Sequence, residues 1–575
     1  MIFAPAVRMT DKSEAEPCLA ISVRGLRVET EGHDGPRALL DDVSFALPHG
    51  HLAAVIGPSG CGKSTLLRSL AGILTPAAGE VSFFNCPASA YRETQPLAIG
   101  YLPQFSEAHE SLTVEEILGF CVDLQLPDAL AFSTRVRWLE YLIELAGLES
   151  VRHQRYGSLS GGQRRRVALA ETLVADPPIL LVDELTSGLD PHAEADMMEW
   201  LRFLTTKASK TVLLVTHSVR HLDRVDSVLF MKEGRLWYHG TFADLKKRKR
   251  EGVIEDLFQM DDLSEIQHSS PFLESNAAPE GAFSVRSSRP ASSLRQFFVL
   301  LRRQMLLFVR DKALIALQLA LLFTFPALVA VFALDGLPQV RNLPLQLDTN
   351  IIRSLQEQLL YLRDSMSSAT LVSGLIMFQV ILLTLAGSND SAREIAKESA
   401  ILDKERRCGL SAWAYVGAKF TLVAMLCLAQ ALWMTWFVKV VCRFPGAFGA
   451  QFAILFLTTL AMGATCLAIS ASSRSAERAS LLSIYLVGLQ LPLSGAVLAL
   501  PDWLVWITRP WIAAYWGWSG YLKTLSDCAV YDVVRQGTHT WLASTRMAGG
   551  VLALHCIVAL GLCALLVQRR SKVPQ

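Results

Sequence analysis

A glycine-rich loop between an apolar run and a helix-forming run is the feature that most restricts how this chain can fold. The loop comprises Gly57, Pro58, Ser59, Gly60, Cys61, Gly62, Lys63, Ser64 and Thr65, with the apolar run 52–56 before it and the run 66–70 after it. Glycines let backbone N–H groups point inward, and the helix start adds positive dipole. A lysine beside a hydroxyl residue can hold phosphates and magnesium. The pattern predicts an α/β domain in which a buried strand, a phosphate-binding loop and a helix follow one another. The alternative, a glycine-rich turn with a chance lysine, is disfavoured by the flanking strand and helix.

Hydrophobic residues are distributed unevenly along the chain. Of its 575 residues 51% are hydrophobic, and the formal net charge is +1. Charged residues are dense up to about residue 265, whereas long apolar runs begin near residue 313, so we expect a soluble half and a membrane half. The near-neutral charge balance provides no general attraction for nucleic acid, and we expect no such partner. Residues 1–19 contain acidic residues and no sustained apolar core, which predicts a short tail rather than a signal peptide.

A second glycine-rich helix start lies at residues 159–163. It contains Ser160, Gly161, Gly162 and Gln163, and a basic helix is expected over residues 164–174. Because the first N–H groups of a helix are free and its dipole is positive there, this is a second possible phosphate site. Upstream, Gln104 follows a short apolar run in what reads as a surface loop.

Two acidic residues end a short buried strand predicted over residues 179–182. They are Asp183 and Glu184, and the segment 187–190 that follows ends in Asp190. An acid at the end of a buried strand can hold magnesium, and the neighbouring carboxylate can orient and deprotonate an attacking water. The next buried strand, 211–216, ends at His217, which is placed to meet a terminal phosphate.

These motifs, in this order and spacing, resemble the ATP-binding cassette of ABC transporters over residues 20–250. The resemblance implies that the loop 57–65 grips the phosphates of ATP, with Ser64, Gln104 and Asp183 around Mg²⁺. It also implies that Glu184 is the general base and that His217 contacts the γ-phosphate. Gln104 is further implied to couple the cassette to the membrane half.

The resemblance also implies a partner. In the family, the signature residues Ser160, Gly161, Gly162 and Gln163 reach ATP held by another subunit, and Asp190 belongs to the loop between subunits. The chain has one phosphate loop and one signature, so a complete site needs a second copy of the chain or a homologous half transporter. Two-fold homodimers are the commonest oligomers, and we expect a homodimer.

The second half of the chain alternates apolar runs with basic connections. We expect a linker over residues 251–293 and an amphipathic helix along the inner membrane face over 294–312. Residues 313–575 are predicted to form an all-α transmembrane domain of six spans, each near the ~20 residues that a crossing needs. The spans are expected at about 313–334, 369–388, 412–439, 449–471, 477–500 and 546–567. Basic residues of the second-to-third and fourth-to-fifth connections and of the tail lie on one side, which predicts a cytoplasmic cassette and cytoplasmic termini.

A cassette followed by six spans is similar to the G-type ABC transporters, the reverse-order half transporters of lipids, sterols and drugs. The charged segment 393–406 resembles their coupling helix, and a long outer segment is expected over residues 501–545. The glutamine of the signature and the lack of glycosylation acceptors in the predicted outer segments favour a bacterial inner membrane. The implied activity is ATP hydrolysis that drives export of a hydrophobic or amphipathic cargo such as a lipid or drug.

Two other functions stay open at this point. One is an ATP-dependent membrane regulator or scaffold that moves no cargo, against which the acid and histidine of the cassette argue. The other is an importer, for which no binding-protein domain is recognisable. The predicted spans contain few charges apart from end residues such as Lys419 and Lys439, and no relay of acids that suggests proton coupling. Most of the eleven cysteines lie in the cassette or in apolar runs, and Cys442 and Cys528 are predicted in segments outside the membrane, where a disulfide is possible.

Overall fold

The computed structural model describes residues 18–32, 35–185, 191–248, 290–332, 351–496, 500–528, 531–532, 534–535 and 540–570. They belong to two compact units. Unit 1 holds the residues up to Val299 together with Lys404–Leu410, and unit 2 holds Leu300–Asp403 and Ser411–Ser571. The expected linker 251–293 lies outside the described residues up to position 289, as do the tail up to residue 17 and the segment 186–190.

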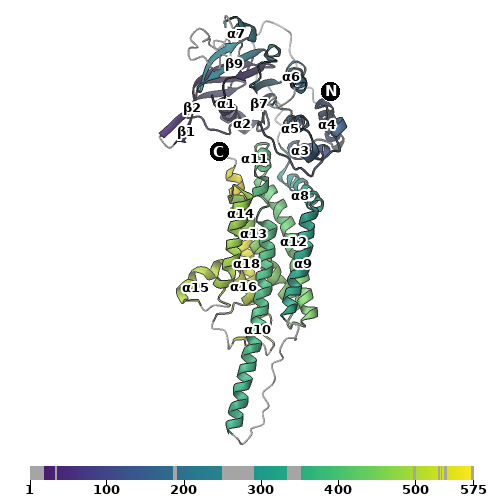
Figure 1. Ribbon diagram of the computed structural model, residues 1–575, viewed down its shortest axis with the longest axis vertical. Helices are drawn as coiled ribbons and strands as arrows, with labels where there is room; N and C mark the ends of the chain where they lie inside the picture. The colour runs from purple at the N-terminus through teal and green to yellow at the C-terminus, as the bar shows by residue number, and fades with distance from the viewer. Residues whose placement is uncertain are drawn as a thin grey trace. The chain divides into compact units, whose positions relative to one another are not determined.

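Unit 1 is built on a six-stranded sheet with the order β10-β9-β3-β8-β7-β6 (Figure 1). Its strands are β3 (Leu52–Ile56), β6 (Ile99–Leu102), β7 (Ile179–Asp183), β8 (Thr211–Val215), β9 (Ser227–Lys232) and β10 (Arg235–Gly240). All neighbours pair in parallel except β9 and β10. A second sheet, with the order β2-β1-β4-β5, contains β1 (Leu19–Gly32), β2 (Gly35–Pro48), β4 (Ala78–Phe83) and β5 (Cys86–Pro87).

Both faces of the parallel sheet are covered, which explains why its strands read as continuous apolar runs. Every residue of β3, β7 and β8 is buried. On one face, alternate strand residues pack with apolar residues of α3 (Val114–Gln125), α5 (Gly161–Leu173) and α6 (Pro191–Thr206). On the other face they pack with α1 (Lys63–Leu70) and with β1 and β2. The remaining helices of this unit are α2 (Ala88–Thr94), α4 (Phe132–Leu145) and α7 (Phe242–Arg248).

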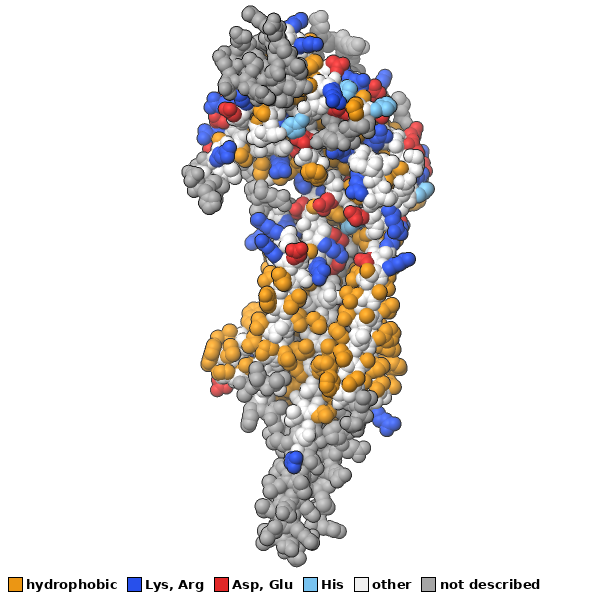
Figure 2. Space-filling model, viewed as in Figure 1, with side chains coloured by type: hydrophobic (Ala, Val, Ile, Leu, Met, Phe, Trp, Pro, Cys, Tyr) orange, Lys and Arg blue, Asp and Glu red, His pale blue; other side chains and the backbone are white. Residues whose placement is uncertain are grey.

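Unit 2 is helical, and its apolar helices pack alongside one another (Figure 1). They are α9 (Lys312–Val331), α10 (Ile351–Ser391), α12 (Ala412–Val441), α13 (Phe448–Ser472), α14 (Ala476–Leu493) and α18 (Thr545–Arg570). Two further helices, α8 (Ser293–Arg310) and α11 (Ser399–Arg407), extend from one unit into the other along the chain. Hydrophobic side chains form a broad band over the visible face of unit 2 (Figure 2).

Among the described residues, five helical stretches are long and apolar enough to cross a membrane. They are Lys312–Val331, Ala369–Arg407, Ala412–Val441, Phe448–Ser472 and Thr545–Arg570. The sixth predicted span, 477–500, corresponds to α14, which is helical over 18 residues, carries Glu477 in its first turn and is not one of the five. Helix α10 begins well before the predicted span 369–388.

Helix α8 covers most of residues 294–312, for which an amphipathic helix is predicted. Its polar Gln296, Arg303 and Gln304 are buried, whereas Leu294 and Phe298 are 68% and 60% exposed. Leu300 of the same helix is also buried and Arg302 is exposed, so burial does not divide α8 into a polar and an apolar side.

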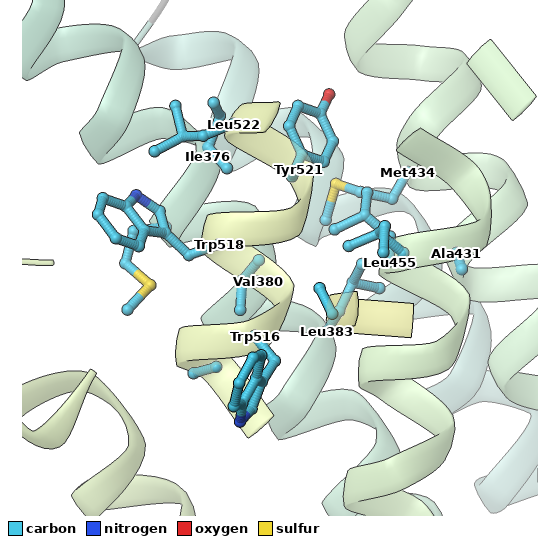
Figure 3. Packing of buried hydrophobic residues seen from close by; sticks show 14 of the residues in the cluster. Ile376, Val380, Leu383, Ala431, Met434, Leu455, Trp516, Trp518, Tyr521 and Leu522 are labelled. Atoms are coloured by element: carbon cyan, nitrogen blue, oxygen red, sulfur yellow. The ribbon is translucent and has the colours of Figure 1, made fainter. Parts of the chain in front are cut away.

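A short helix that the sequence analysis did not predict fills the centre of unit 2. Residues 501–545 were expected to form an outer segment, but α16 (Ala513–Lys523) has every residue from Ala513 to Leu522 buried. Its Trp516, Trp518, Tyr521 and Leu522 pack with apolar side chains of α10, α12 and α13 (Figure 3). Before it, α15 (Asp502–Thr508) has no buried residue. All eleven cysteines fall within the described ranges and carry free thiols, so the possible Cys442–Cys528 disulfide is not formed.

Helices α10 and α13 approach each other closely at a glycine. A Cβ atom added at Gly387 would lie 2.5 Å from the carbonyl oxygen of Thr459, so only glycine fits at this crossing. Small residues commonly permit such contacts between membrane helices. On the same helix, Gly374 is exposed and has no atom within 4 Å of an added Cβ.

We predict that Gly387→Leu destabilises unit 2 by overpacking, at a cost of about 1–3 kcal/mol. The melting temperature of the purified protein in detergent should fall for Gly387→Leu and stay near the wild-type value for Gly374→Leu. Equal losses for the two variants would show that glycine at this crossing is not required.

Candidate functional site

The candidate site lies at the carboxyl ends of four neighbouring parallel strands of unit 1. The loop 57–62 follows β3, Gln104 follows β6, Glu184 follows β7 and His217 follows β8. Because parallel strands point the same way, their carboxyl ends share one edge of the sheet, where α/β proteins bind ligands. This topology brings together residues that are up to 160 positions apart in the sequence.

The phosphate loop depends on glycine where its backbone passes close to neighbouring backbone. A Cβ added at Gly57 would lie 2.0 Å from the carbonyl oxygen of Met231. Gly62 has φ +101°, and a Cβ there would lie 2.9 Å from the carbonyl oxygen of Leu39. The loop is therefore wedged between β9 and β2, and α1 begins immediately after it at Lys63.

Lys63 lies across the loop. Its side chain is buried, and its ammonium donates to the carbonyl oxygens of Gly57 and Pro58, each at 2.8 Å. The thiol of Cys61 is 3.8 Å from the same nitrogen. An ammonium has three donors and no acceptor, so the loop carbonyls hold it in place at the mouth of the loop.

Ser64 and Asp183 provide adjacent oxygen ligands. The hydroxyl of Ser64 donates to the carboxylate of Asp183 at 3.0 Å. Burial raises the pKa of Asp183, and the bond from Ser64 opposes part of that shift. Mg²⁺ in nucleotide sites takes one or two protein oxygens and completes its shell with phosphate and water. The donor set fits that ion, although no cluster of three or more histidine, cysteine or acidic side chains occurs in the part of the chain described.

The carboxylate of Glu184 is held from two sides. Gln104 Nε2 donates to one of its oxygens at 2.5 Å, and His217 Nε2 makes a short contact with the other. Its own backbone has φ +49°, in the left-handed region that costs free energy for a residue other than glycine. The amide N–H of Glu184 donates to the carbonyl of Val215 on β8 at 3.0 Å, which fixes this turn. Glu184 is thus oriented by the residues that follow β6 and β8.

Arg165 was not singled out from the sequence. Burial lowers the pKa of its guanidinium, and the charge of Glu184 acts in the opposite direction, which places the two groups within electrostatic range. The basic helix after residue 163 was the available signal, but the sequence could not show which of its three arginines faces the acid.

The predicted signature begins α5, as expected from its glycines. Ser160 caps the helix, because its hydroxyl accepts from the backbone N–H of Gln163 at 3.3 Å and the Gln163 side chain accepts from the Ser160 N–H at 2.9 Å. Ser160 and Gly161 are exposed, and no atom lies within 4 Å of a Cβ added at Gly161. These two residues of the signature are therefore accessible at the surface of unit 1. Asp190 lies outside the described residues.

Residues 404–410 form part of the same unit and contact two elements of the site. Lys404 Nζ pairs with Glu171 of α5 at 2.9 Å and donates to the carbonyl of Glu107 at 2.9 Å. The guanidinium of Arg407 lies over the ring of Tyr101 on β6. Lys404 is thus bonded both to the helix that begins with the signature and to the loop that contains Gln104.

Comparisons with known proteins find relatives of both halves of the chain. The family model described as "ABC transporter" matches residues 40–187, and the one described as "ABC-2 type transporter" matches residues 295–518. The ABC transporter ATP-binding/permease protein Rv1747 of Mycobacterium tuberculosis is 29% identical over 532 residues, or 88% of this chain. The chain spans 57% of the length of that relative.

Other relatives match the first half. The Nod factor export ATP-binding protein I of Rhizobium sp. (strain N33) is 36% identical over 36% of this chain and 67% of that protein. The sulfate/thiosulfate import ATP-binding protein CysA of Nocardia farcinica is 37% identical over 37% of this chain and 64% of that protein. The dimeric structure of the bacterial ABC transporter cassette MJ0796 is 26% identical, with a TM-score of 0.36 and coverage of 38% of this chain and 98% of that one.

The cassette model matches the first half of the chain and the membrane-domain model matches the second half, in the order expected from the sequence. The apolar helices of the second half are those of a multi-pass membrane protein. The chain belongs to the ABC transporter family, with an ATP-binding cassette followed by an ABC-2 type membrane domain.

Proposed function

We propose that this chain is one half of a homodimeric exporter that hydrolyses ATP in the bacterial inner membrane. The observation that carries the proposal is the Gln104–Glu184–His217 arrangement beside the phosphate loop, in a chain that also has apolar spans. A pure nucleotide sensor does not need a carboxylate held in this way, which weighs against a regulator or scaffold without cargo. The cassette and both termini are proposed to be cytoplasmic, with α14 as the sixth span.

The residues of the site have separate tasks in this proposal. Lys63 exchanges the carbonyls of Gly57 and Pro58 for phosphate oxygens, and Ser64 and Asp183 hold Mg²⁺, which supplies charge neutralisation at the phosphates when bound. Water attacks the γ-phosphorus, the bond from that phosphorus to the ADP oxygen breaks, and Glu184 accepts the proton of the water. Gln104 and His217 keep the Glu184 carboxylate aimed at that water, and His217 is also proposed to contact the γ-phosphate.

The cargo is proposed to be hydrophobic or amphipathic, such as a lipid or drug. Apolar side chains dominate the visible face of unit 2 (Figure 2), and the described spans present few charges. Two relatives of the cassette are named for export and import, so the direction rests on the resemblance of the whole chain to reverse-order exporters. ATP-dependent accumulation of a fluorescent lipid in sealed inside-out vesicles would support export, and ATP turnover without any movement of cargo would favour the regulator.

We predict that Glu184→Gln lowers ATP turnover by about 10²–10⁴-fold while ATP still binds, because an amide cannot accept the proton of water. Steady-state ATPase assays in lipid nanodiscs, with nucleotide binding measured in parallel, test this. The control is Glu149→Gln at an exposed acid of the same unit, which should leave turnover unchanged. Wild-type turnover in Glu184→Gln would remove this residue as the base.

A mixing experiment tests the composite site. Lys63→Met disables the phosphate loop and Ser160→Arg obstructs the signature, so each homodimer should be inactive. A heterodimer isolated through two different affinity tags should recover about half of the wild-type turnover, since one of its two sites is intact if the signature acts across a two-fold interface. A heterodimer as inactive as both parents would contradict the proposed pairing.

We expect the Lys404–Glu171 pair to couple ATP hydrolysis in the cassette to cargo transport. Because Glu171 is buried, removal of one partner leaves an uncompensated charge, which typically costs about 3–5 kcal/mol. We predict that Lys404→Met reduces cargo transport more than ATP turnover, and that Lys404→Glu combined with Glu171→Lys recovers part of the transport. The measurement is the ratio of cargo moved to ATP hydrolysed in proteoliposomes. An unchanged ratio in Lys404→Met would show that this pair does not couple the two activities.

A further inference from the structure

Three polar side chains from three apolar helices meet inside unit 2. They are Gln318 of α9, Asp390 of α10 and Gln430 of α12, with 8%, 7% and 6% of their surfaces exposed. Gln318 Nε2 donates to one oxygen of Asp390 at 2.5 Å, and Gln430 Nε2 donates to the other at 3.0 Å. The carboxyl group therefore has amide donors on both oxygens and almost no access to solvent.

Asp390 lacks the basic partner that other buried acids of this unit have. Lys419 of α12 pairs with Glu394 at 3.1 Å and with Glu398 at 2.9 Å, so one buried cation neutralises two carboxylates. Among the described residues no lysine, arginine or histidine pairs with Asp390. The titratable groups that face it are Glu394, which follows it closely in the chain, and Cys427 of α12, behind which lies Cys556 of α18. None of these groups supplies positive charge.

An unpaired carboxylate in such a place is unfavourable. Moving an isolated ionised carboxyl group out of water costs far more free energy than two hydrogen bonds from neutral amides recover. Such groups usually become neutral instead. Ionisable residues within membrane helices are rare, and they mark proton or ion pathways more often than structural contacts.

The hydrogen bonds of the cluster are compatible with a neutral acid. Gln430 Nε2 also donates to Gln318 Oε1 at 3.0 Å, so both amide nitrogens are used, but Gln430 Oε1 is buried without a donor. Each oxygen of a carboxylic acid can still accept a hydrogen bond, so protonation of Asp390 keeps both amide bonds.

We propose that Asp390, between Gln318 and Gln430, is a proton-binding site of the membrane domain and is occupied by a proton in this conformation. This goes beyond ATP-driven export and does not depend on it. A change that separates α9, α10 and α12 and admits water would release the proton, and closure would take one up. The step is a simple protonation, in which the proton moves between water and one oxygen of Asp390.

Infrared spectroscopy tests the proposal directly. The full-length protein in a maltoside detergent, which has no ester carbonyl, should show at mildly acidic pH, above the usual titration range of aspartate near about pH 4, the carbonyl stretch of a neutral carboxylic acid, shifted in D₂O. The band should be lost completely in Asp390→Asn, which preserves size and hydrogen bonding, and retained in Asp502→Asn, at an exposed acid of the same unit. A wild-type minus Asp390→Asn difference spectrum that contains only carboxylate bands overturns the proposal.

A second pair of measurements keeps the proposal testable if Asp390→Asn does not fold. Wild-type protein labelled with ¹³C in its aspartate side chains should show the isotope shift of the same band, and Gln430→Leu should move its frequency because a hydrogen-bond partner is lost. A labelled wild-type spectrum without a neutral aspartic acid band at these pH values also overturns the proposal.

The pH dependence of stability gives an independent readout. If Asp390 is protonated in the fold and ionised when the chain unfolds, unfolding releases a proton, so stability falls as pH rises. The melting temperature of the wild type should therefore fall more steeply between about pH 4, where aspartate usually titrates, and neutral pH than that of Asp390→Asn. Parallel profiles for the two proteins contradict the proposed proton.

Discussion

The position of one carboxylate, that of Glu184, depends on the order of four parallel strands. Because β7 lies between β6 and β8, and β8 lies beside β3, the residues that follow these strands must meet at one edge of the sheet. Gln104 and His217 then reach Glu184 from opposite sides, while Lys63 and Ser64 start the helix after β3. The left-handed backbone at Glu184 is unfavourable by itself, and the bond from its N–H to Val215 on the next strand helps to retain it. The chemistry of the site follows from strand order.

The membrane domain obeys a different constraint, since buried charge cannot be compensated by water. Lys419 satisfies it with two glutamates and the side-chain oxygen of Gln304, at 3.0 Å. Helix α16 avoids buried charge because its buried residues are apolar or form hydrogen bonds. The indole N–H of Trp518, for example, donates to the hydroxyl of Ser373 at 3.1 Å. Asp390 accepts hydrogen bonds from two amides and has no basic partner among the described residues, so its own protonation is the way to remove the charge.

Local patterns predicted the elements of the cassette well. The strand before the phosphate loop, the helix start at the signature and the strand that ends at Asp183 are all found, because glycine, burial and capping act over a few neighbouring residues. The contact of Gln104 with Glu184 and the approach of Arg165 could not be predicted, since they depend on which strands are neighbours. The burial of α16 and the cluster around Asp390 were missed for a related reason: hydropathy shows that a segment is apolar or polar, but not which helices surround it.

The double attachment of Lys404 limits how the cassette can move. Its single ammonium is bonded to α5 through Glu171 and to the loop after β6 through the carbonyl of Glu107. If either element shifts alone, a bond must break, so the low-energy displacements are those in which both travel together. A movement of α5 and a movement of the loop after β6 therefore displace residues 404–410 together, as a single joint motion rather than two independent ones.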